Sequence, residues 1–468
     1  MSELSQKASS EPRYPQLWEA LIPVIFLLVF LSYYIINLKG ENPHLPLIGG
    51  TIIAGMMAWR LGYKWKSIQD GIIEGIKISL QAILILMLIG MLISTWIASG
   101  IVPTMIYYGL ELLSPTYFFF VACIICAVVS LATGSSWTTA GTVGVALIGI
   151  SDGLGLPVPI TAGAIISGAY FGDKMSPLSD STNLAAVVGN TELFEHIRHM
   201  IYTTLPALII ALILYLTIGL NISFGQTEQA DVHMISNTLQ EKFILHWLLL
   251  LPILFVGLIV YFRVPAIPAL LGGILLGSLI SMTVQDISFG KILEIAHSGY
   301  KGQTEVQSVD ELLNRGGLQS MMWTISLIIC ALSFGGVMEK SGMLKVIALS
   351  ILKRTNTAGS LVAATATTCI GTNIIAADQY LALILPGRMY QAAYIDAKLA
   401  TKNLSRVIED SGTLSSPLIP WNTCGATMIA TLGVMPWTYV PYCFLNLITP
   451  LISILYGFTG ITMIKVKK

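Results

Sequence analysis

The chain has 468 residues, of which 54% are apolar and only 11% are charged. A soluble domain carries roughly 25% charged residues, so this composition indicates an integral membrane protein with several spanning helices. The 25 basic and 25 acidic residues balance to a net charge of zero, which argues against nucleic acid as a partner.

The N-terminal tail, residues 1–17, is polar and lacks the short apolar core of a cleavable signal peptide. Apolar stretches that could span a bilayer follow it at 18–37, 45–59, 72–98, 201–222, 244–262, 266–284, 318–337 and 437–459. Among the six cysteines, Cys123 and Cys126 have CxxC spacing, but inside an apolar run we interpret them as helix-packing thiols.

Four further apolar regions are interrupted by polar residues. With their interruptions they are 117–150 ("TGSSW", 133–137), 158–189 ("GDKMSPLSDSTN", 172–183), 358–385 ("IGTN", 370–373) and 391–433 ("EDSGTLSSPLIPWNT", 409–423). The arms around the breaks have about 15 residues, short of the roughly 20 that a spanning helix needs. This length favours a re-entrant hairpin followed by a broken helix in each half of the chain.

The interruptions recur at matched spacing, which predicts an internal repeat. Gly134 precedes Asp173 by 39 residues (173 − 134), and Gly371 precedes Asp410 by the same number (410 − 371). Further matches in the same order are "SPL" (176–178 and 416–418), "LPLIGGTIIAG" (45–55) with "IPALLGGILLG" (267–277), and "ASGIV" (98–102) with "KSGML" (340–344). We therefore predict two repeats, 18–222 and 244–460, joined by a polar linker, 223–243.

The basic residues predict the orientation of the chain in the membrane. Lys and Arg concentrate in 1–17, 60–66, 340–354 and 461–468, whereas the linker carries three acids and one Lys. This pattern predicts cytoplasmic termini and an extracellular linker. The predicted fold class is an all-α polytopic membrane protein with two inverted-topology repeats, each of about five transmembrane helices plus a re-entrant hairpin and a broken helix.

Broken helices near the midplane of a membrane are typical of transporters, because unwound backbone and hydroxyl groups there can bind a cation. Sodium prefers oxygen ligands, and the interruptions are rich in them. The candidate Na⁺ or substrate ligands are Thr133, Gly134, Ser135, Ser136, Ser176, Ser181, Thr182 and Asn183 in the first half, and Thr372, Asn373, Thr413, Ser415, Ser416, Asn422 and Thr423 in the second. We expect no transition-metal site and no cofactor, with Na⁺ as a transported ion.

Carboxylates inside a membrane are costly and are functional candidates by default. Burial favours the protonated form of a carboxyl group and a nearby cation favours the ionised form, so one carboxylate can hold a proton or Na⁺ in alternation. The candidates are Asp173, Asp180, Asp378, Glu409 and Asp410, and among them we expect Asp173 to carry the proton.

Structural roles remain open as alternatives for most of these acids. Lys174 could pair with Asp173 in a salt bridge, and Asp180 could be a helix N-cap. Glu409 could be a solvated acid at a helix end, and Asp378 a capping or packing residue.

Two motifs, "ATGSSWTTAGTVG" (132–144) and "GAYFGDKMSPLSDSTNLAA" (168–186), resemble the NhaC-type Na⁺/H⁺ antiporter family of the ion transporter superfamily, and the resemblance covers essentially the whole chain. It implies exchange of Na⁺ for H⁺ by alternating access in a bacterial cell membrane. It also implies two inverted repeats, a homodimer and an elevator-like transport domain. One branch of the family takes up malate with protons and releases lactate with Na⁺, and this sequence is similar to that branch too.

Other classes of function fit the sequence less well. No GxSxG or HExxH motif occurs, so we expect no enzyme activity. His196 and His199 lie on a charged stretch that we interpret as an interfacial helix and not a metal site. A passive cation channel would also need polar breaks, but not an acid that exchanges a proton.

Overall fold

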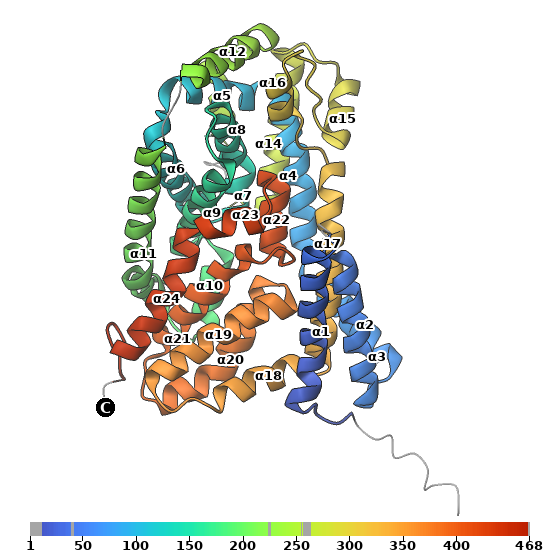
Figure 1. Ribbon diagram of the computed structural model, residues 1–468, viewed down its shortest axis with the longest axis vertical. Coiled ribbons are helices and arrows are strands. Elements are labelled where there is room, and N and C mark those ends of the chain that lie inside the picture. The colour runs from blue at the N-terminus through green and yellow to red at the C-terminus, as the bar shows by residue number, and fades with distance from the viewer. Residues whose placement is uncertain (1–11, 39–41, 223–225, 254, 256–263, 467–468) are drawn as a thin grey trace, which may run out of the picture.

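The structure is a computed structural model that describes residues 12–38, 42–222, 226–253, 255 and 264–466 (Figure 1). Helices make up almost all of its regular structure, and in these ranges the β-pairing is limited to an isolated bridge between Leu399 and Lys465. The prediction of an all-α membrane protein is confirmed. The expected span 244–262 and the ends of both tails lie partly outside the described residues.

Helices outside the predicted breaks cover most of the predicted apolar stretches and also form at several places between them. In the first half they are α1 (Leu17–Ile36), α2 (His44–Arg60), α3 (Trp65–Ile78), α4 (Leu80–Ala98), α5 (Ile101–Leu112) and α11 (Leu193–Asn221). In the second they are α14 (Ala266–Thr283), α15 (Phe289–Ser298), α16 (Gln307–Leu313), α17 (Met322–Lys340), α18 (Met343–Leu352), and α23 (Pro436–Tyr439) with α24 (Phe444–Thr459). The single span expected at 72–98 is wrong, because the chain bends at Ser79 and leaves α3 and α4 as separate helices.

The broken regions of both halves form helices interrupted by turns, and several of these helices lie in the middle of the molecule (Figure 1). The first half contributes α6 (Phe118–Thr133), α7 (Ser136–Thr139), a π-helical turn η2 (Ala140–Gly144), α8 (Val145–Gly153), α9 (Val158–Met175) and α10 (Asp180–Val188). The second half contributes α19 (Ala358–Ala376), α20 (Gln379–Asp396), α21 (Thr401–Ile408), a π-helical turn η5 (Glu409–Thr413), a 3-10 turn η6 (Ser416–Leu418) and α22 (Thr423–Leu432).

The two ends of the molecule carry different parts of the chain. In Figure 1 the start of α1 and the end of α24 lie at the lower end, whereas α12 (Gln226–Lys242), in the linker, lies at the upper end. The hairpin of α19 and α20 lies toward the lower end, and α8 lies toward the upper end.

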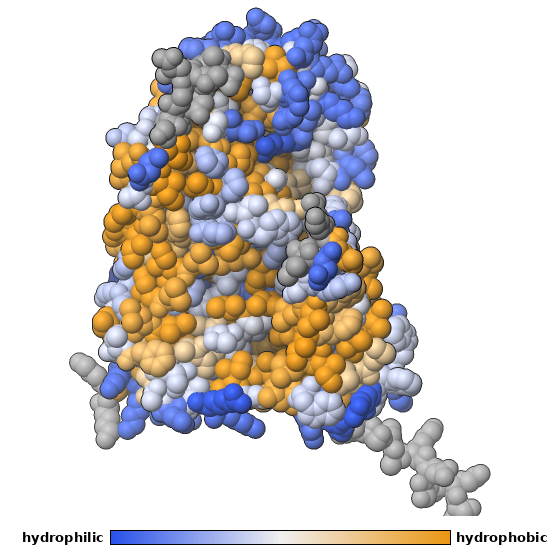
Figure 2. All heavy atoms as spheres, viewed as in Figure 1, coloured by the Kyte–Doolittle hydropathy of each residue, from blue (hydrophilic) through white to orange (hydrophobic). Residues whose placement is uncertain are grey.

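The described residues include seven helices long and apolar enough to cross a membrane, or eight when the pair around α23 and α24, bent by 58°, counts as one span. Figure 2 shows the matching surface, a broad apolar band with polar residues gathered at both ends. The molecule is therefore a multi-pass membrane protein.

Sequence motifs matched between the halves adopt the same local conformation. Gly100 in "ASGIV" has φ +80° and begins α5, and Gly342 in "KSGML" has φ +73° and begins α18. The helix pairs also correspond across the halves, because α4 packs against α14 while α17 packs against α2. These similarities agree with an internal repeat, whose inverted topology remains a prediction.

Candidate functional site

The two breaks of the first half lie against each other. Helix α6 ends at Thr133, Gly134 adopts φ +66°, and Ser135 caps α7 by accepting a hydrogen bond from the Thr138 amide (3.1 Å). A Cβ atom on Gly134 would lie 2.7 Å from Cβ of Leu178, which belongs to the break between α9 and α10. Glycine is therefore required here both for its left-handed backbone and for the close approach of the two breaks.

Asp173 joins these two breaks. It lies in the last turn of α9, where its Oδ2 accepts hydrogen bonds from the Ser136 hydroxyl (2.7 Å) and the Ser136 amide (3.2 Å). Asp173 is only 8% exposed. The unwound part of the motif 172–183 is thus shorter than predicted, because only the stretch 176–179 lies between the helices.

The break predicted at "IGTN" (370–373) is wrong in position. Helix α19 runs through these residues to Ala376, and the Thr372 hydroxyl donates back to the Thr368 carbonyl (2.8 Å), which satisfies it inside the helix. The break instead occurs at Ala377, with φ +58°, and at Asp378, whose Oδ1 caps α20 by accepting from the Leu381 amide (3.0 Å). The capping alternative for Asp378 is therefore the one that the structure supports.

Amide side chains connect the two breaks of the second half. Asn373 donates to the Gly412 carbonyl (2.6 Å) and to the Ser415 hydroxyl (2.9 Å), and Asn422 donates to Asn373 Oδ1 (2.9 Å). Both asparagines are fully buried. Residues 409–413, predicted as part of the break, are instead a π-helical turn, and the chain unwinds only after the 3-10 turn η6, at 419–422. Such turns occur often at functional sites.

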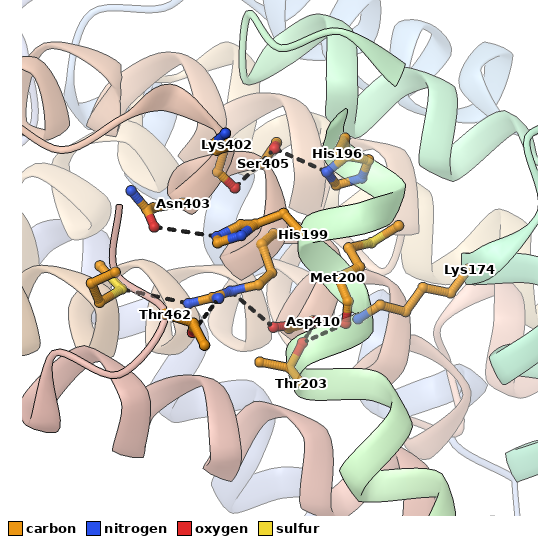
Figure 3. Close-up of polar contacts among 12 residues, drawn as sticks. Lys174, His196, His199, Met200, Thr203, Lys402, Asn403, Ser405, Asp410 and Thr462 are labelled. Carbon is orange, nitrogen blue, oxygen red and sulfur yellow. Dashed lines mark hydrogen bonds and ion pairs between the residues drawn. The ribbon is translucent and has the colours of Figure 1, made fainter. Parts of the chain in front are cut away.

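A buried ion-pair network joins the halves (Figure 3). Lys174 forms an ion pair with Asp410 Oδ1, which also accepts a hydrogen bond from Thr203 (3.1 Å). Arg406 lies one helical turn before Asp410, with its Nε 3.9 Å from Oδ2. Lys174, Arg406 and Asp410 are all fully buried. The alternative that pairs Lys174 with Asp173 is wrong. Lys174 pairs instead with Asp410, the residue of the second half that corresponds to Asp173 in the repeat.

Glu409 is buried next to this network without a cationic partner among the described residues. Its Oε1 accepts a hydrogen bond from Ser181 of α10 (3.1 Å). Within the described ranges, Glu409 Oε2, Asp410 Oδ2, and the hydroxyls of Ser411 and Thr413 have no hydrogen-bond partner. Four buried oxygen atoms on one π-helical turn thus remain available as ligands. The interpretation of Glu409 as a solvated acid is wrong.

Other predicted residues are less central. Asp180 is exposed and opens α10, whose N-cap is Ser179, so the N-cap alternative for Asp180 is wrong. Asn183 is also exposed, and its amide donates to the Pro177 (2.9 Å) and Ser179 (2.7 Å) carbonyls. The remaining predicted ligands, which are at least partly buried in or beside the breaks, are Thr133, Ser135, Ser176, Thr182, Ser416 and Thr423.

Several contributors to the site were missed from the sequence. Arg406 lies four residues before Asp410, a spacing that brings two side chains together on a helix and could have identified it. Thr203 and the partner of Lys174 gave no sequence signal. His196 and His199 lie in the first two turns of α11 and are buried against Ser405 (2.9 Å) and Asn403 (3.3 Å), contacts that the sequence did not predict.

The described chain contains no group of three His, Cys, Asp or Glu side chains arranged to hold a metal ion. The site is instead a set of buried carboxylates, hydroxyls and two cations where broken helices from both halves meet. Together with the apolar band, it defines a multi-pass membrane protein with the architecture of a transporter.

Comparison with known proteins identifies the family. Residues 168–461 match the model of the Na⁺/H⁺ antiporter family, and the chain belongs to this family. It is 40% identical over 442 residues to the Na⁺/H⁺ antiporter NhaC of Alkalihalophilus pseudofirmus, covering 94% of this chain and 95% of the relative. It is 38% identical over 450 residues to the malate-2H⁺/Na⁺-lactate antiporter of Bacillus subtilis, covering 96% of both. The arginine/ornithine antiporter ArcD of Halobacterium salinarum is 39% identical over 449 residues, covering 95% of this chain and 92% of that protein.

Proposed function

We propose that this protein exchanges Na⁺ for H⁺ across the membrane at the buried network. The observation that carries this proposal is an imbalance of charge. The buried charged residues of α9, α21 and η5 are three carboxylates, Asp173, Glu409 and Asp410, and two cations, Lys174 and Arg406, so full ionisation leaves one excess negative charge among them (3 − 2 = 1).

An uncompensated charge in a membrane interior is strongly unfavourable, so the network requires one more positive charge. A proton on a carboxyl group supplies it, and so does a bound Na⁺. The two ions then occupy the same set of carboxylates in alternation. If each ion enters and leaves on either side of the membrane, this competition produces antiport.

The partners of each acid suggest separate roles. Asp410 forms an ion pair with Lys174 through Oδ1, and its Oδ2 lies 3.9 Å from Nε of Arg406, so we assign it the role of holding these two cations at the site. Asp173 and Glu409 have only hydroxyl or amide partners among the described residues, so they are the acids that exchange the proton. Of these two acids we assign the proton to Asp173, and we assign Na⁺ to Glu409 together with Ser181, Thr413 and Oδ2 of Asp410. Asp378 caps the start of α20 and Asp180 is the first residue of α10, and we assign neither of them a transported ion.

The proposal includes the topology and assembly expected from the sequence. The two repeats are inverted, the termini are cytoplasmic and the linker is extracellular. The position of α12 at one end, opposite to the end of α24 and the start of α1, supports this arrangement (Figure 1). The exchanged pairs α4 with α14 and α17 with α2 support a two-fold relation between the repeats. The protein forms a homodimer in the bacterial cell membrane and uses no cofactor.

A second candidate function is the coupled exchange of organic acids, malate with protons for lactate with Na⁺. It is favoured by the two buried cations and by a relative of nearly the same identity with that name. Both cations already face Asp410, which leaves less positive charge for a dicarboxylate. Identity of 38–40% does not choose between these substrates, because the relatives in this range carry names with different ones.

Transport by the purified protein in liposomes separates the candidates. An outward or inward Na⁺ gradient is imposed, and the internal pH is followed with a trapped dye, with and without malate and lactate. Na⁺/H⁺ exchange moves protons with Na⁺ alone. Coupled organic-acid exchange requires both acids, and a passive channel dissipates the Na⁺ gradient without the opposite proton movement.

A further inference from the structure

The end of the chain is fastened close to the ion-pair network. Residues 462–466, here called the C-terminal strap, lie along the loop between α20 and α21. The Ala400 amide donates to the Ile464 carbonyl (2.8 Å), and the Val466 amide donates to the Lys398 carbonyl (3.0 Å). The strap is therefore held by backbone hydrogen bonds, although most of its side chains are exposed.

Three strap residues contact buried side chains of α21. Asn403 donates to the Ile464 carbonyl (2.7 Å) and accepts from the Ile464 amide (3.1 Å). Arg406 donates through Nη1 to the Thr462 hydroxyl (2.7 Å) and through Nη2 to the Met463 sulfur (3.5 Å). Figure 3 shows this chain of contacts running from Thr462 to Asp410. Both terminal nitrogens of the guanidinium are thus engaged by the strap.

The remaining nitrogen of Arg406 faces Asp410 across a gap. Its Nε is 3.9 Å from Oδ2, although a direct charge-assisted hydrogen bond would be about 2.7–2.9 Å. In the described part of the chain neither atom has a hydrogen-bond partner, and both residues are fully buried. Opposite charges four residues apart on a helix attract each other, and the contacts that oppose a closer approach of this guanidinium are those with Thr462 and Met463.

The backbone of Thr462 indicates that this contact is strongly constrained. Thr462 has φ +58°, a left-handed conformation that a β-branched residue rarely adopts. Such strain persists only where the surroundings over-determine the conformation, and it is concentrated at functional sites. In this backbone conformation the Thr462 hydroxyl accepts the hydrogen bond from Nη1 of Arg406.

We propose that Thr462 is a positioning residue, which keeps Arg406 far enough from Asp410 that Oδ2 remains available to the transported cation. This inference rests on the proposed Na⁺/H⁺ exchange. When the tether is lost, Arg406 closes on Asp410 and competes with Na⁺. The strap thereby sets the affinity of the site for Na⁺ without touching the ion.

The test compares four variants in liposomes, with the apparent KM for Na⁺ and kcat measured separately. Thr462→Val removes the hydroxyl but keeps the branched shape, whereas Thr462→Ser keeps the hydroxyl. We expect Thr462→Val to raise KM by about ten-fold, the effect of one charge-assisted hydrogen bond, with little change in kcat. Thr462→Ser should match the wild type. Arg406→Gln removes the competing cation and should lower KM.

The double variant Arg406→Gln, Thr462→Val distinguishes tethering from general packing. In the Arg406→Gln background there is no guanidinium, so removing the Thr462 hydroxyl cannot free one to approach Asp410. The double variant should therefore have the same KM for Na⁺ as Arg406→Gln. Equal KM values for Thr462→Val and the wild type would overturn the inference while leaving Na⁺/H⁺ exchange intact. A wild-type protein without Na⁺-driven proton movement would instead refute the proposed function. If Arg406→Gln does not fold, the valine and serine variants carry the test.

Discussion

Replacing Lys174 by methionine tests whether the ion pair with Asp410 holds the two halves together. Methionine keeps the length and apolar stem of the lysine and removes its charge. Breaking a buried ion pair by deleting one partner costs about 3–5 kcal/mol, because the other charge stays buried and uncompensated. Arg406 partly compensates for this loss of stability. Its charge lies 3.9 Å from Asp410, and the Coulomb attraction at that distance is about 4 kcal/mol at an effective dielectric constant of 20. We therefore expect Lys174→Met to lower the free energy of unfolding by about 3 kcal/mol, the lower end of that range.

The assay is equilibrium unfolding of the purified protein in detergent, with Lys291→Met as the matched control. Lys291 pairs with Glu294 at 3.0 Å, but both side chains are more than half exposed, at 56% and 63%. An exposed pair contributes about 0–1 kcal/mol, so the control should unfold almost like the wild type. If Lys174→Met and Lys291→Met had equal stability, the buried pair would contribute no more than a surface pair, and the reasoning would be refuted.

Two further predictions use the same preparation or the intact membrane. Gly134→Ala should destabilise the protein by about 1–2 kcal/mol or more, because of its left-handed backbone and the close approach of Leu178, and should reduce transport. Gly371→Ala is its control, since nothing lies within 4 Å of the added methyl group inside a helix, and equal losses in both variants would contradict the assigned position of the break. In whole cells, a membrane-impermeant thiol reagent should label Asn237→Cys in α12 and not Lys66→Cys; the opposite result would overturn the proposed topology.

Much of the architecture could be predicted because composition and spacing report on it directly. A bilayer requires long apolar helices, so the positions of α1, α11, α14 and α17 followed from hydropathy. Polar breaks in such segments cannot face lipid, which located the two halves of the site. The sequence could not specify where each break falls, because side-chain hydroxyls can return to the helix, as the hydroxyl of Thr372 does.

The pairing of charges was beyond sequence reasoning for a different reason. Lys174 follows Asp173 directly, so a local pair looked favourable. Adjacent residues on a helix point in different directions, however, and the lysine reaches Asp410 from the other half of the chain. Contacts between segments more than 200 residues apart depend on how the repeats pack, which spacing within one repeat does not report.

Proton movement driven by Na⁺, measured for the wild type and for Asp173→Asn in liposomes, tests the central claim most directly. The asparagine keeps the size of the side chain but can neither take up a proton nor supply the negative charge. The account predicts rapid, Na⁺-dependent pH change with the wild type and none with Asp173→Asn, although the variant inserts and folds normally. Near-normal exchange by Asp173→Asn would contradict the account.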